Sequence, residues 1–206
     1  YTGNHSSLKE NLSIFKFKRE KKIISWIVLI LQNILNSLSI KIFNTIKFYS
    51  EKLILKKNIS CGINTFFYPL DNIINWNEFY GKKGFIQYQF VLPYKDCEKK
   101  IIQILSILIK TGHTPYLAVM KNMKKDKGVI SFSKNGISLA LDIPESDLLK
   151  KIIQRLDKII LHANGKIYLA KDSYLDKKTF QKMYSGYKKL KQIRKKYNLV
   201  NFQSLQ

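Results

Sequence analysis

The residues best suited to chemistry lie in one short stretch of alternating character, GFIQYQFVLP at 84–93. Alternation of this kind predicts a β-strand, because successive side chains of a strand point to opposite faces. One face would carry Ile86, Tyr88 and Phe90, and the other Gln87 and Gln89 flanked by Phe85 and Val91. Two neutral amides can donate and accept several hydrogen bonds, which suits a hydroxyl-rich ligand such as a sugar. A solvated strand face would also carry glutamine, so alternation alone leaves both interpretations open.

Two lysines and a tyrosine are further candidates, because they lie at or near the ends of predicted strands. Lys121 ends the stretch 116–121, and Lys171 follows the stretch 166–170, which contains Tyr168. A lysine at a strand end usually faces solvent, but it can also act as a point charge for a phosphate or a developing oxyanion. A tyrosine can hydrogen-bond while its ring stacks. Position alone does not decide between these roles.

The elements that must position these residues follow one another in a regular order. Strands are predicted over 84–92, 116–121, 129–143 with a break at 135–136, and 166–170, and helices over 101–108, 149–160 and 180–190. Residues 122–128 form a basic turn, the glycines of 111–112 and 164–165 end the first two helices, and Ser146 is a candidate N-cap. The order β-α-β-β-α-β between 84 and 170 predicts an α+β, ferredoxin-like fold with helices on one face of an antiparallel sheet.

The charge balance is strongly basic. The 206 residues include 37 Lys and Arg against 14 Asp and Glu, a net charge of +23. Such an excess attracts phosphates, nucleic acid or anionic membranes. The abundance of Lys, Ile and Asn is equally expected from A/T-rich codons, so the charge does not by itself require a polyanionic partner. With 45% hydrophobic residues, the chain has enough apolar material for a core.

The remaining features exclude several classes of site. Cys61 and Cys97 form no CxxC, and no metal-ligand spacing with histidine is visible. The apolar run at 23–43 is interrupted by polar residues after Leu31, so it predicts a buried or interfacial helix instead of a membrane span. No P-loop, GxSxG, HExxH or GxGxxG motif is present.

A basic ferredoxin-like RNA- or membrane-binding module without catalysis is the alternative to an enzyme domain. KGFIQYQF (83–90) loosely matches the aromatic strand of an RNA-recognition domain. Ile86 stands where that strand needs a small residue, and Gln87 where it needs a stacking aromatic. The strand would also be the first of the fold instead of the third. These departures disfavour nucleic acid as the partner.

The stretch FFYPLDNIINWNEFYGKKGFIQYQFVLP (66–93) resembles the C-terminal half of FAD-linked oxidoreductases of the vanillyl-alcohol-oxidase type. Within that family it is most similar to the oxidase components of decaprenylphosphoryl-β-D-ribose 2-epimerase, and more distantly to sugar-lactone oxidases. GKIYLAKDS (165–173), KMY (182–184) and NFQS (201–204) support the resemblance in order and spacing. It covers 62–206 well and 1–61 weakly.

The resemblance implies a mechanism and a set of partners. A sugar alcohol carbon would pass hydride to FAD, which a domain outside this chain would mainly bind, and another acceptor would reoxidise the flavin. The substrate would be a sugar or a polyprenyl-phosphate sugar, with a reductase or epimerase partner and a peripheral membrane contact. The family context implies a location in the cytoplasm or at the inner membrane.

The resemblance also assigns residues by position. Lys171 and Tyr168 would approach the flavin and the reacting oxygen, as catalytic and cofactor-binding residues. The substrate wall would consist of Gln87, Gln89, Lys121, Phe67, Val119, Met123, Ser138 and Ala140. Close relatives carry an aromatic at the Met123 position, Asn at that of Ser138 and, in mycobacterial members, Cys at that of Ala140. These departures leave the fold unaffected but put the identity of the sugar in doubt.

The expected organisation has three parts. Residues 1–61 form a basic segment with an amphipathic helix, 62–165 the substrate-binding domain, and 166–206 a strand and helix that pack on the absent FAD domain. The start at Tyr1 and the end before a family-typical basic terminus indicate a fragment. We expect this piece alone to bind FAD weakly and to be inactive.

Overall fold

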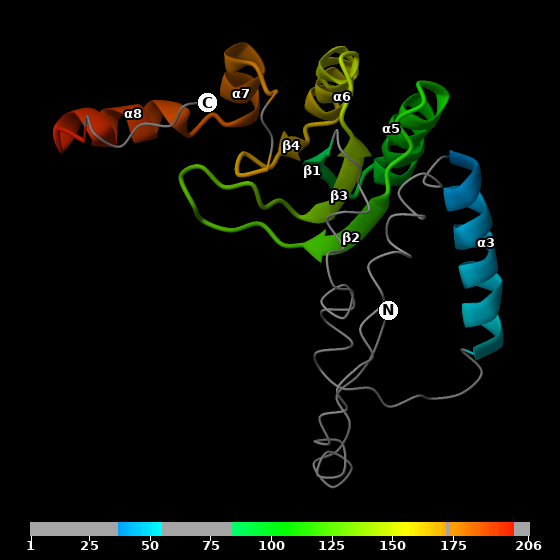
Figure 1. Cartoon of the computed structure of the whole chain (residues 1–206). Coiled ribbons are helices and arrows are strands. Elements are labelled where there is room, and N and C mark those ends of the chain that lie inside the picture. The colour runs from blue at the N-terminus through cyan, green and yellow to red at the C-terminus, as the bar shows by residue number, and fades with distance from the viewer. Residues whose placement is uncertain (1–36, 55–83, 172–173, 200–206) are drawn as a thin grey trace, which may run out of the picture. The chain divides into compact units, whose positions relative to one another are not determined.

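A computed structural model describes residues 37–54, 84–171 and 174–199 (Figure 1). The chain divides into two compact units, residues 1–82 and 83–206. Helix α3, Ser37–Ile54, lies in the first unit. Of the helix predicted over 23–43, only 37–43 falls within the described residues, and it is helical there. Unlike the prediction, the helix continues to Ile54. None of the helices in the described ranges has the length and apolar character to cross a bilayer.

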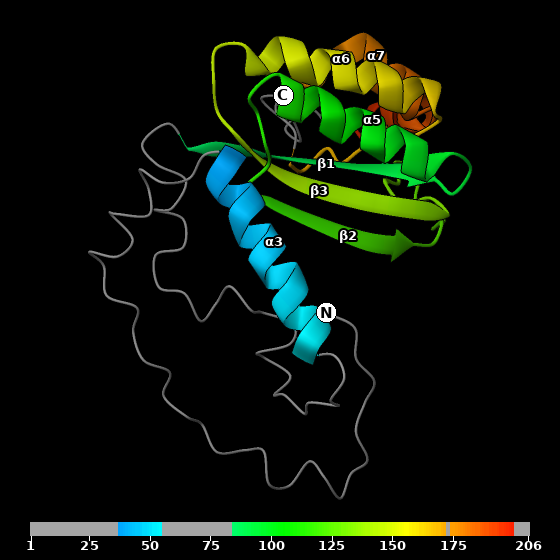
Figure 2. The ribbon, with the colours of Figure 1, turned by 90° about the vertical axis from the view of Figure 1, so that its right-hand side faces the viewer.

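The second unit is built on a four-stranded antiparallel sheet in the order β2-β3-β1-β4. Its elements are β1 Phe85–Pro93, α5 Cys97–Lys110, β2 Leu117–Met123, β3 Gly136–Pro144, α6 Leu149–His162, β4 Lys166–Ile167, α7 Lys177–Met183 and α8 Tyr187–Lys196. Helices α5 and α6 lie side by side on one face of the sheet, as Figure 2 shows. The predicted α+β, ferredoxin-like order is therefore confirmed.

The core lies between the sheet and these helices. Alternation along β1 places Tyr88, Phe90 and Leu92 inside, and all three are fully buried. Their β3 neighbours Leu141, Leu139 and Ile137 share that face, because residues paired across an antiparallel ladder point the same way. The helices complete the core with Ile101, Ile104, Leu108, Ile153, Leu156 and Ile160. Tyr88 donates a 2.6 Å hydrogen bond to the buried carboxylate of Asp157 on α6.

The predicted ends of both core helices are confirmed. After α5, Gly112 has a φ of +77°, a conformation that glycine adopts without steric cost. After α6, Asn164 has a φ of +54°, which asparagine tolerates better than most residues. Ser146 does not cap α6, whose N-cap is Leu148 without a side-chain bond. The Ser146 hydroxyl instead lies 2.6 Å from Nε2 of the buried His113 ring, and this hydrogen bond takes the place of a helix cap.

Three predicted elements differ from the structure. Residues 129–135 are not strand but part of a loop, here called the hairpin loop (residues 124–135), because side-chain bonds such as Ser133 N–H to Ser131 Oγ hold them in turns. Strand β4 ends at Ile167. The backbone N–H of Lys171 donates to the carbonyl of Tyr168, which closes a turn after the strand. The single helix predicted over 180–190 is two helices.

The break between α7 and α8 falls at Gly186. A Cβ placed there would lie 1.9 Å from the carbonyl oxygen of Val129, so the hairpin loop packs directly against this glycine. Tyr184 beside it is buried and donates to the carbonyl of Ile167. Helix α7 also contributes Met183 to the core. The three-part division with boundaries at 61 and 165 stays a prediction. The two compact units show where the chain packs on itself, not which part binds a substrate or another domain.

Candidate functional site

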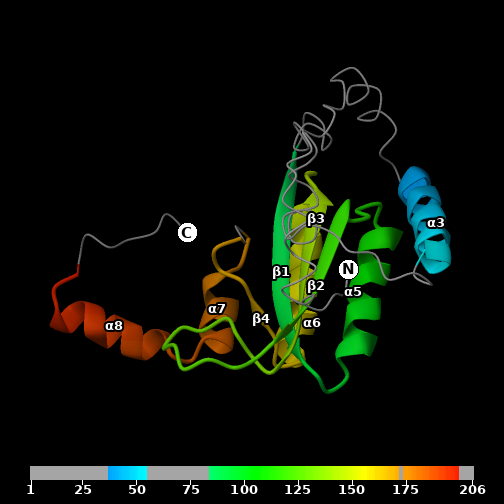
Figure 3. The same ribbon diagram turned by 90° about the horizontal axis from the view of Figure 1, so that it is seen from below.

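The face of the sheet opposite α5 and α6, here called the open face, carries the predicted substrate wall. The three strands bring together Gln87 and Gln89 from β1, Val119, Lys121 and Met123 from β2, and Ser138 and Ala140 from β3. The register fixes this grouping, because Gln89 pairs with Ala140, and Ala140 pairs with Val119 on its other side. Of the predicted wall, Phe67 alone lies outside the described residues. Figure 3 shows the sheet edge-on, with α5 to one side.

Gln87 is oriented by a carboxylate on the neighbouring strand. Its Nε2 donates to Asp142 Oδ1 at 2.9 Å, directly across the β1–β3 pair. Asp142 is only 2% exposed. An ionised carboxylate only accepts, so the amide must turn its NH₂ group toward Asp142. The carbonyl oxygen of Gln87 is thereby held in a defined direction, as an acceptor for a ligand hydroxyl.

Gln89 is oriented in a similar way by a hydroxyl. Its Nε2 donates to Ser138 Oγ at 3.1 Å, and Ser138 is 1% exposed. Each glutamine uses one N–H in these bonds, which leaves the other N–H and the carbonyl oxygen with hydrogen-bonding capacity. The two amides, both half-buried, therefore form a pre-oriented pair of donor–acceptor groups.

Two lysines lie at the ends of one row across the sheet, next to the row that contains Gln89. Lys121 pairs with Ser138, Ser138 with Val91, and Val91 with Lys166. At about 4.8 Å between neighbouring strands, the two lysines stand roughly 14 Å apart at the backbone. Lys121 is exposed and Lys166 half-buried. Ser138 and the buried Val91 lie between the two lysines in this row, and the amides lie beside it.

Tyr168 and Lys171, the predicted flavin-facing residues, follow β4. The backbone N–H of Tyr168 donates to the backbone carbonyl of Gln89 at 2.8 Å, so Tyr168 is the neighbour of Gln89 on the adjacent strand. Its ring packs on Phe132 of the hairpin loop, with centroids 4.9 Å apart. Lys171 is exposed in the turn after β4. The structure thus brings Tyr168 to the wall and puts Lys171 at its border.

The hairpin loop is fastened to β4 by lysines. Lys166 donates to the carbonyl of Ser131 at 2.5 Å and lies 5.1 Å from the ring centre of Tyr184. Lys134 donates to the carbonyl of Asn164. Burial, and then the charge of Lys134, lower the pKa of Lys166. Because these cations hold carbonyls, we assign them first to positioning the loop.

Sequence reasoning missed two residues of the open face. Asp142 shares its parity with Ser138 and Ala140 along β3, so the alternation SLALD contained the signal. Lys166 precedes Ile167 of the core, and only the pairing of β4 with β1 reveals which face it occupies. Asp142 contacts Gln87 and sets the orientation of its amide, whereas Lys166 contacts the hairpin loop through Ser131.

The arrangement suits recognition of a hydroxyl-rich ligand that carries an anionic substituent. Within the described ranges, no group of three or more His, Cys, Asp or Glu residues could hold a metal ion. The fold and this face together define a ferredoxin-like α+β domain with a polar open face. No family model matches the chain.

The sequence of this chain is similar to that of a known protein. The chain is 34% identical over 124 residues to the decaprenylphosphoryl-beta-D-ribose oxidase of Mycolicibacterium smegmatis. The match covers 60% of this chain and 27% of that protein, so this chain spans about a quarter of the relative's length. The similarity confirms the predicted resemblance: this chain is related to a decaprenylphosphoryl-ribose oxidase.

Proposed function

We propose that this chain is the substrate-binding portion of an FAD-dependent oxidoreductase that oxidises a sugar alcohol carbon. The observation that carries the proposal is the oriented amide pair on the open face, in a chain related to a sugar oxidase. The substrate is a polyprenylphosphoryl-ribose-like sugar, or an aldonolactone-like sugar. We further propose that FAD is bound mainly by a part of the protein outside these residues.

The residues of the open face hold and orient the sugar. Gln87 and Gln89 accept from and donate to its hydroxyl groups, with their directions fixed by Asp142 and Ser138. Amides suit this role because they hydrogen-bond to hydroxyl groups without carrying a charge or taking up a proton. Lys121, exposed at the side of the pair, supplies positive charge to an anionic substituent or to the oxygen that is losing its proton.

Tyr168 and Lys171 fit the requirements of a flavin neighbour. Tyr168 is the backbone neighbour of Gln89 and carries a hydroxyl, and Lys171 carries an exposed ammonium in the turn that follows. A hydrogen-bond donor and a cation suit the electron-rich edge of a flavin ring. FAD, when bound, supplies the hydride-accepting chemistry, and the protein supplies position and electrostatics. The packing of Tyr168 on Phe132 keeps water from one side of the ring.

The test uses the full-length enzyme. Gln89→Ala removes one oriented amide and should raise KM for the sugar by roughly tenfold, the effect of about one hydrogen bond. Lys171→Ala should abolish turnover while leaving the fold intact. Gln154→Ala, an exposed glutamine on α6 of the covered face, is the matched control and should change neither.

Specific outcomes would overturn the proposal. An unchanged KM in Gln89→Ala would remove the amide pair from the site, and retained turnover in Lys171→Ala would refute its role. An upstream reading frame without a flavin-binding domain would refute the oxidoreductase assignment itself. A stoichiometric flavin spectrum from the 206-residue chain alone would show that the cofactor is held here and not elsewhere.

A further inference from the structure

The turn after β4, here called the Lys171 turn (residues 168–171), carries an exposed ammonium. Its backbone is fixed at one end, where the N–H of Tyr168 donates to the carbonyl of Gln89 at 2.8 Å. The N–H of Lys171 closes the turn on the carbonyl of Tyr168 at 3.2 Å. A lysine ammonium sits on a flexible four-carbon stem, so its position depends on how firmly the backbone beneath it is held.

A second anchor follows three residues after Lys171 in the sequence. The Tyr174 hydroxyl lies 3.2 and 3.1 Å from the two carboxylate oxygens of Glu145 and donates to them as one shared hydrogen bond. Both side chains are half-buried, and Tyr174 also packs against the hydrophobic core. This pair, here called the Glu145–Tyr174 clasp, ties the chain after the Lys171 turn to the end of β3.

The acceptor of the clasp is itself held in place. The backbone N–H of Glu145 donates to the carbonyl of Gly84 at 3.2 Å. Its carboxylate Oε1 accepts from the backbone N–H of Ser146 at 3.0 Å. The Ser146 hydroxyl in turn lies 2.6 Å from Nε2 of the buried His113 ring. The clasp therefore stands on a chain of hydrogen bonds that reaches the buried residue just beyond α5.

The two anchors lie on either side of Gln87 along β1. One is at Gln89, and the other is beside Gly84, to which Glu145 is bonded. Lys171 is three residues from each of the two anchoring tyrosines. Three residues of chain reach at most about 11 Å, so both anchors limit how far the backbone of Lys171 can move from the amide pair.

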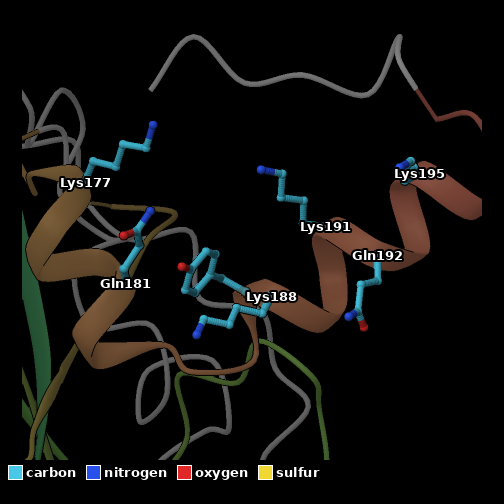
Figure 4. Close-up of a pocket in the computed structure, with 7 residues that line it drawn as sticks. Lys177, Gln181, Lys188, Lys191, Gln192 and Lys195 are labelled. Atoms are coloured by element: carbon cyan, nitrogen blue, oxygen red, sulfur yellow. The ribbon is translucent and has the colours of Figure 1, made fainter.

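Helix α7, which follows the clasp, faces a different feature. It shares with α8 a hollow of about 440 Å³, lined by Lys177 and Gln181 on its own side. Figure 4 shows the lysines and glutamines of the two helices around this space. None of the described residues of 168–175 lines it. The hollow therefore does not position the Lys171 turn.

We propose that Glu145 and Tyr174 are positioning residues that hold the Lys171 ammonium in place for the oxidation. The inference rests on the proposed function and extends it, because neither side chain is assigned a contact with the sugar or the flavin, and both act through Lys171. A charge stabilises a developing oxyanion best when it is fixed before the reaction. A displacement of about 1 Å at such a group can slow a reaction roughly a hundredfold.

Steady-state kinetics of the full-length enzyme are the first measurement. Tyr174→Phe removes the hydroxyl and keeps the ring, so it should lower kcat by roughly tenfold. KM for the sugar should stay unchanged, because Gln87 and Gln89 are untouched. Glu145→Ala should act alike, and the double variant should be no worse than either single one. Glu145→Gln keeps an acceptor oxygen and should recover most of the rate.

Hydrogen exchange in the same enzyme gives a readout that does not depend on turnover. Tyr174→Phe should speed exchange of the amides of 168–171 by roughly fivefold, because local opening becomes easier when a hydrogen bond is lost. Exchange in β1 should stay unchanged, whereas a general loss of stability would speed both segments. Tyr94→Phe removes an exposed tyrosine hydroxyl at the other end of β1 and is the matched control, which should change neither exchange nor kcat.

Each contrary result has a distinct meaning. Unchanged exchange at 168–171 in Tyr174→Phe would overturn the clasp without touching the proposed function. Faster exchange with an unchanged kcat, in an enzyme that Lys171→Ala inactivates, would show that the clasp does not serve the reaction. An equal fall of kcat in Tyr94→Phe would remove the specificity of the effect. Retained turnover in Lys171→Ala would refute the role of that lysine, and this inference with it.

Discussion

The two faces of the sheet use different kinds of side chain, although those side chains alternate along the same strands. The face under α5 and α6 buries Tyr88, Phe90 and Leu92, and its polar group is a tyrosine hydroxyl bonded to Asp157. The open face instead pairs amides with a carboxylate and a hydroxyl. Burial of apolar area stabilises the first face. Under the proposed function the second face binds the sugar, so stability and binding would be divided between the two faces of single strands.

The largest effect should come from the covered face. Phe90→Ala leaves a cavity between the sheet and the helices and should lower the free energy of unfolding by about 3–5 kcal/mol. Gln89 directly precedes Phe90 but lies on the open face. Gln89→Ala should lower the free energy of unfolding by only about 1 kcal/mol, the value of one hydrogen bond. Urea unfolding measures both. Equal losses would contradict the division of roles between the faces.

The polar pair of the covered face should be the next most costly to break. Tyr88→Phe removes the hydroxyl that donates to Asp157 at 2.6 Å and keeps the ring. We expect a loss of about 1–3 kcal/mol, because a buried carboxylate loses a donor. The double variant Tyr88→Phe with Asp157→Leu should recover part of the lost free energy of unfolding, measured by urea unfolding. If it recovers none, the two side chains are not energetically coupled.

On the open face, a single atom exchange should create pH dependence. Gln87→Glu puts a new carboxylate against that of Asp142, and their repulsion raises the pKa of the introduced carboxyl in the folded state. A raised folded pKa means that the stability is present at acid pH and is lost as the pH rises through it. We expect a loss of about 1–2 kcal/mol between pH 4 and pH 7, at about 1.4 kcal/mol per unit of pKa change. Gln89→Glu, facing Ser138, should lack most of this dependence.

The smallest effect should appear in alkali at the edge of the core. Burial raises the pKa of the Tyr184 hydroxyl above its ordinary value of 10.0. A raised folded pKa contributes stability below pH 10 that is lost as the pH rises further. Tyr184→Phe should therefore show a shallower decline above pH 10 in chemical unfolding. A decline as steep as that of the parent would show that this hydroxyl ionises without cost in the folded protein.

Local patterns predicted much of the fold and of the wall. Alternation assigned Gln87 and Gln89 to the face opposite Tyr88, and glycine and asparagine marked the helix ends correctly. What failed depended on distant partners. Ser146 bonds to His113 instead of capping α6, and Gly186 bends the last helix because Val129 lies against it. The place of Lys166 on the open face follows from the pairing of β4, which no local pattern contains.

If the open face binds the sugar as proposed, the alternation along β1 restricts how its substrate preference can evolve. Inserting or deleting one residue between Gln87 and Phe90 would move every following side chain to the opposite face. An insertion directly after Gln87, for example, would place Gln89 in the core and Phe90 on the open face. Divergence along this strand must therefore proceed by substitution, whereas the hairpin loop, which has no ladder register to keep, can change length between Met123 and Gly136. Among related chains we expect specificity to vary by residue type on the strands and by loop length at 124–135.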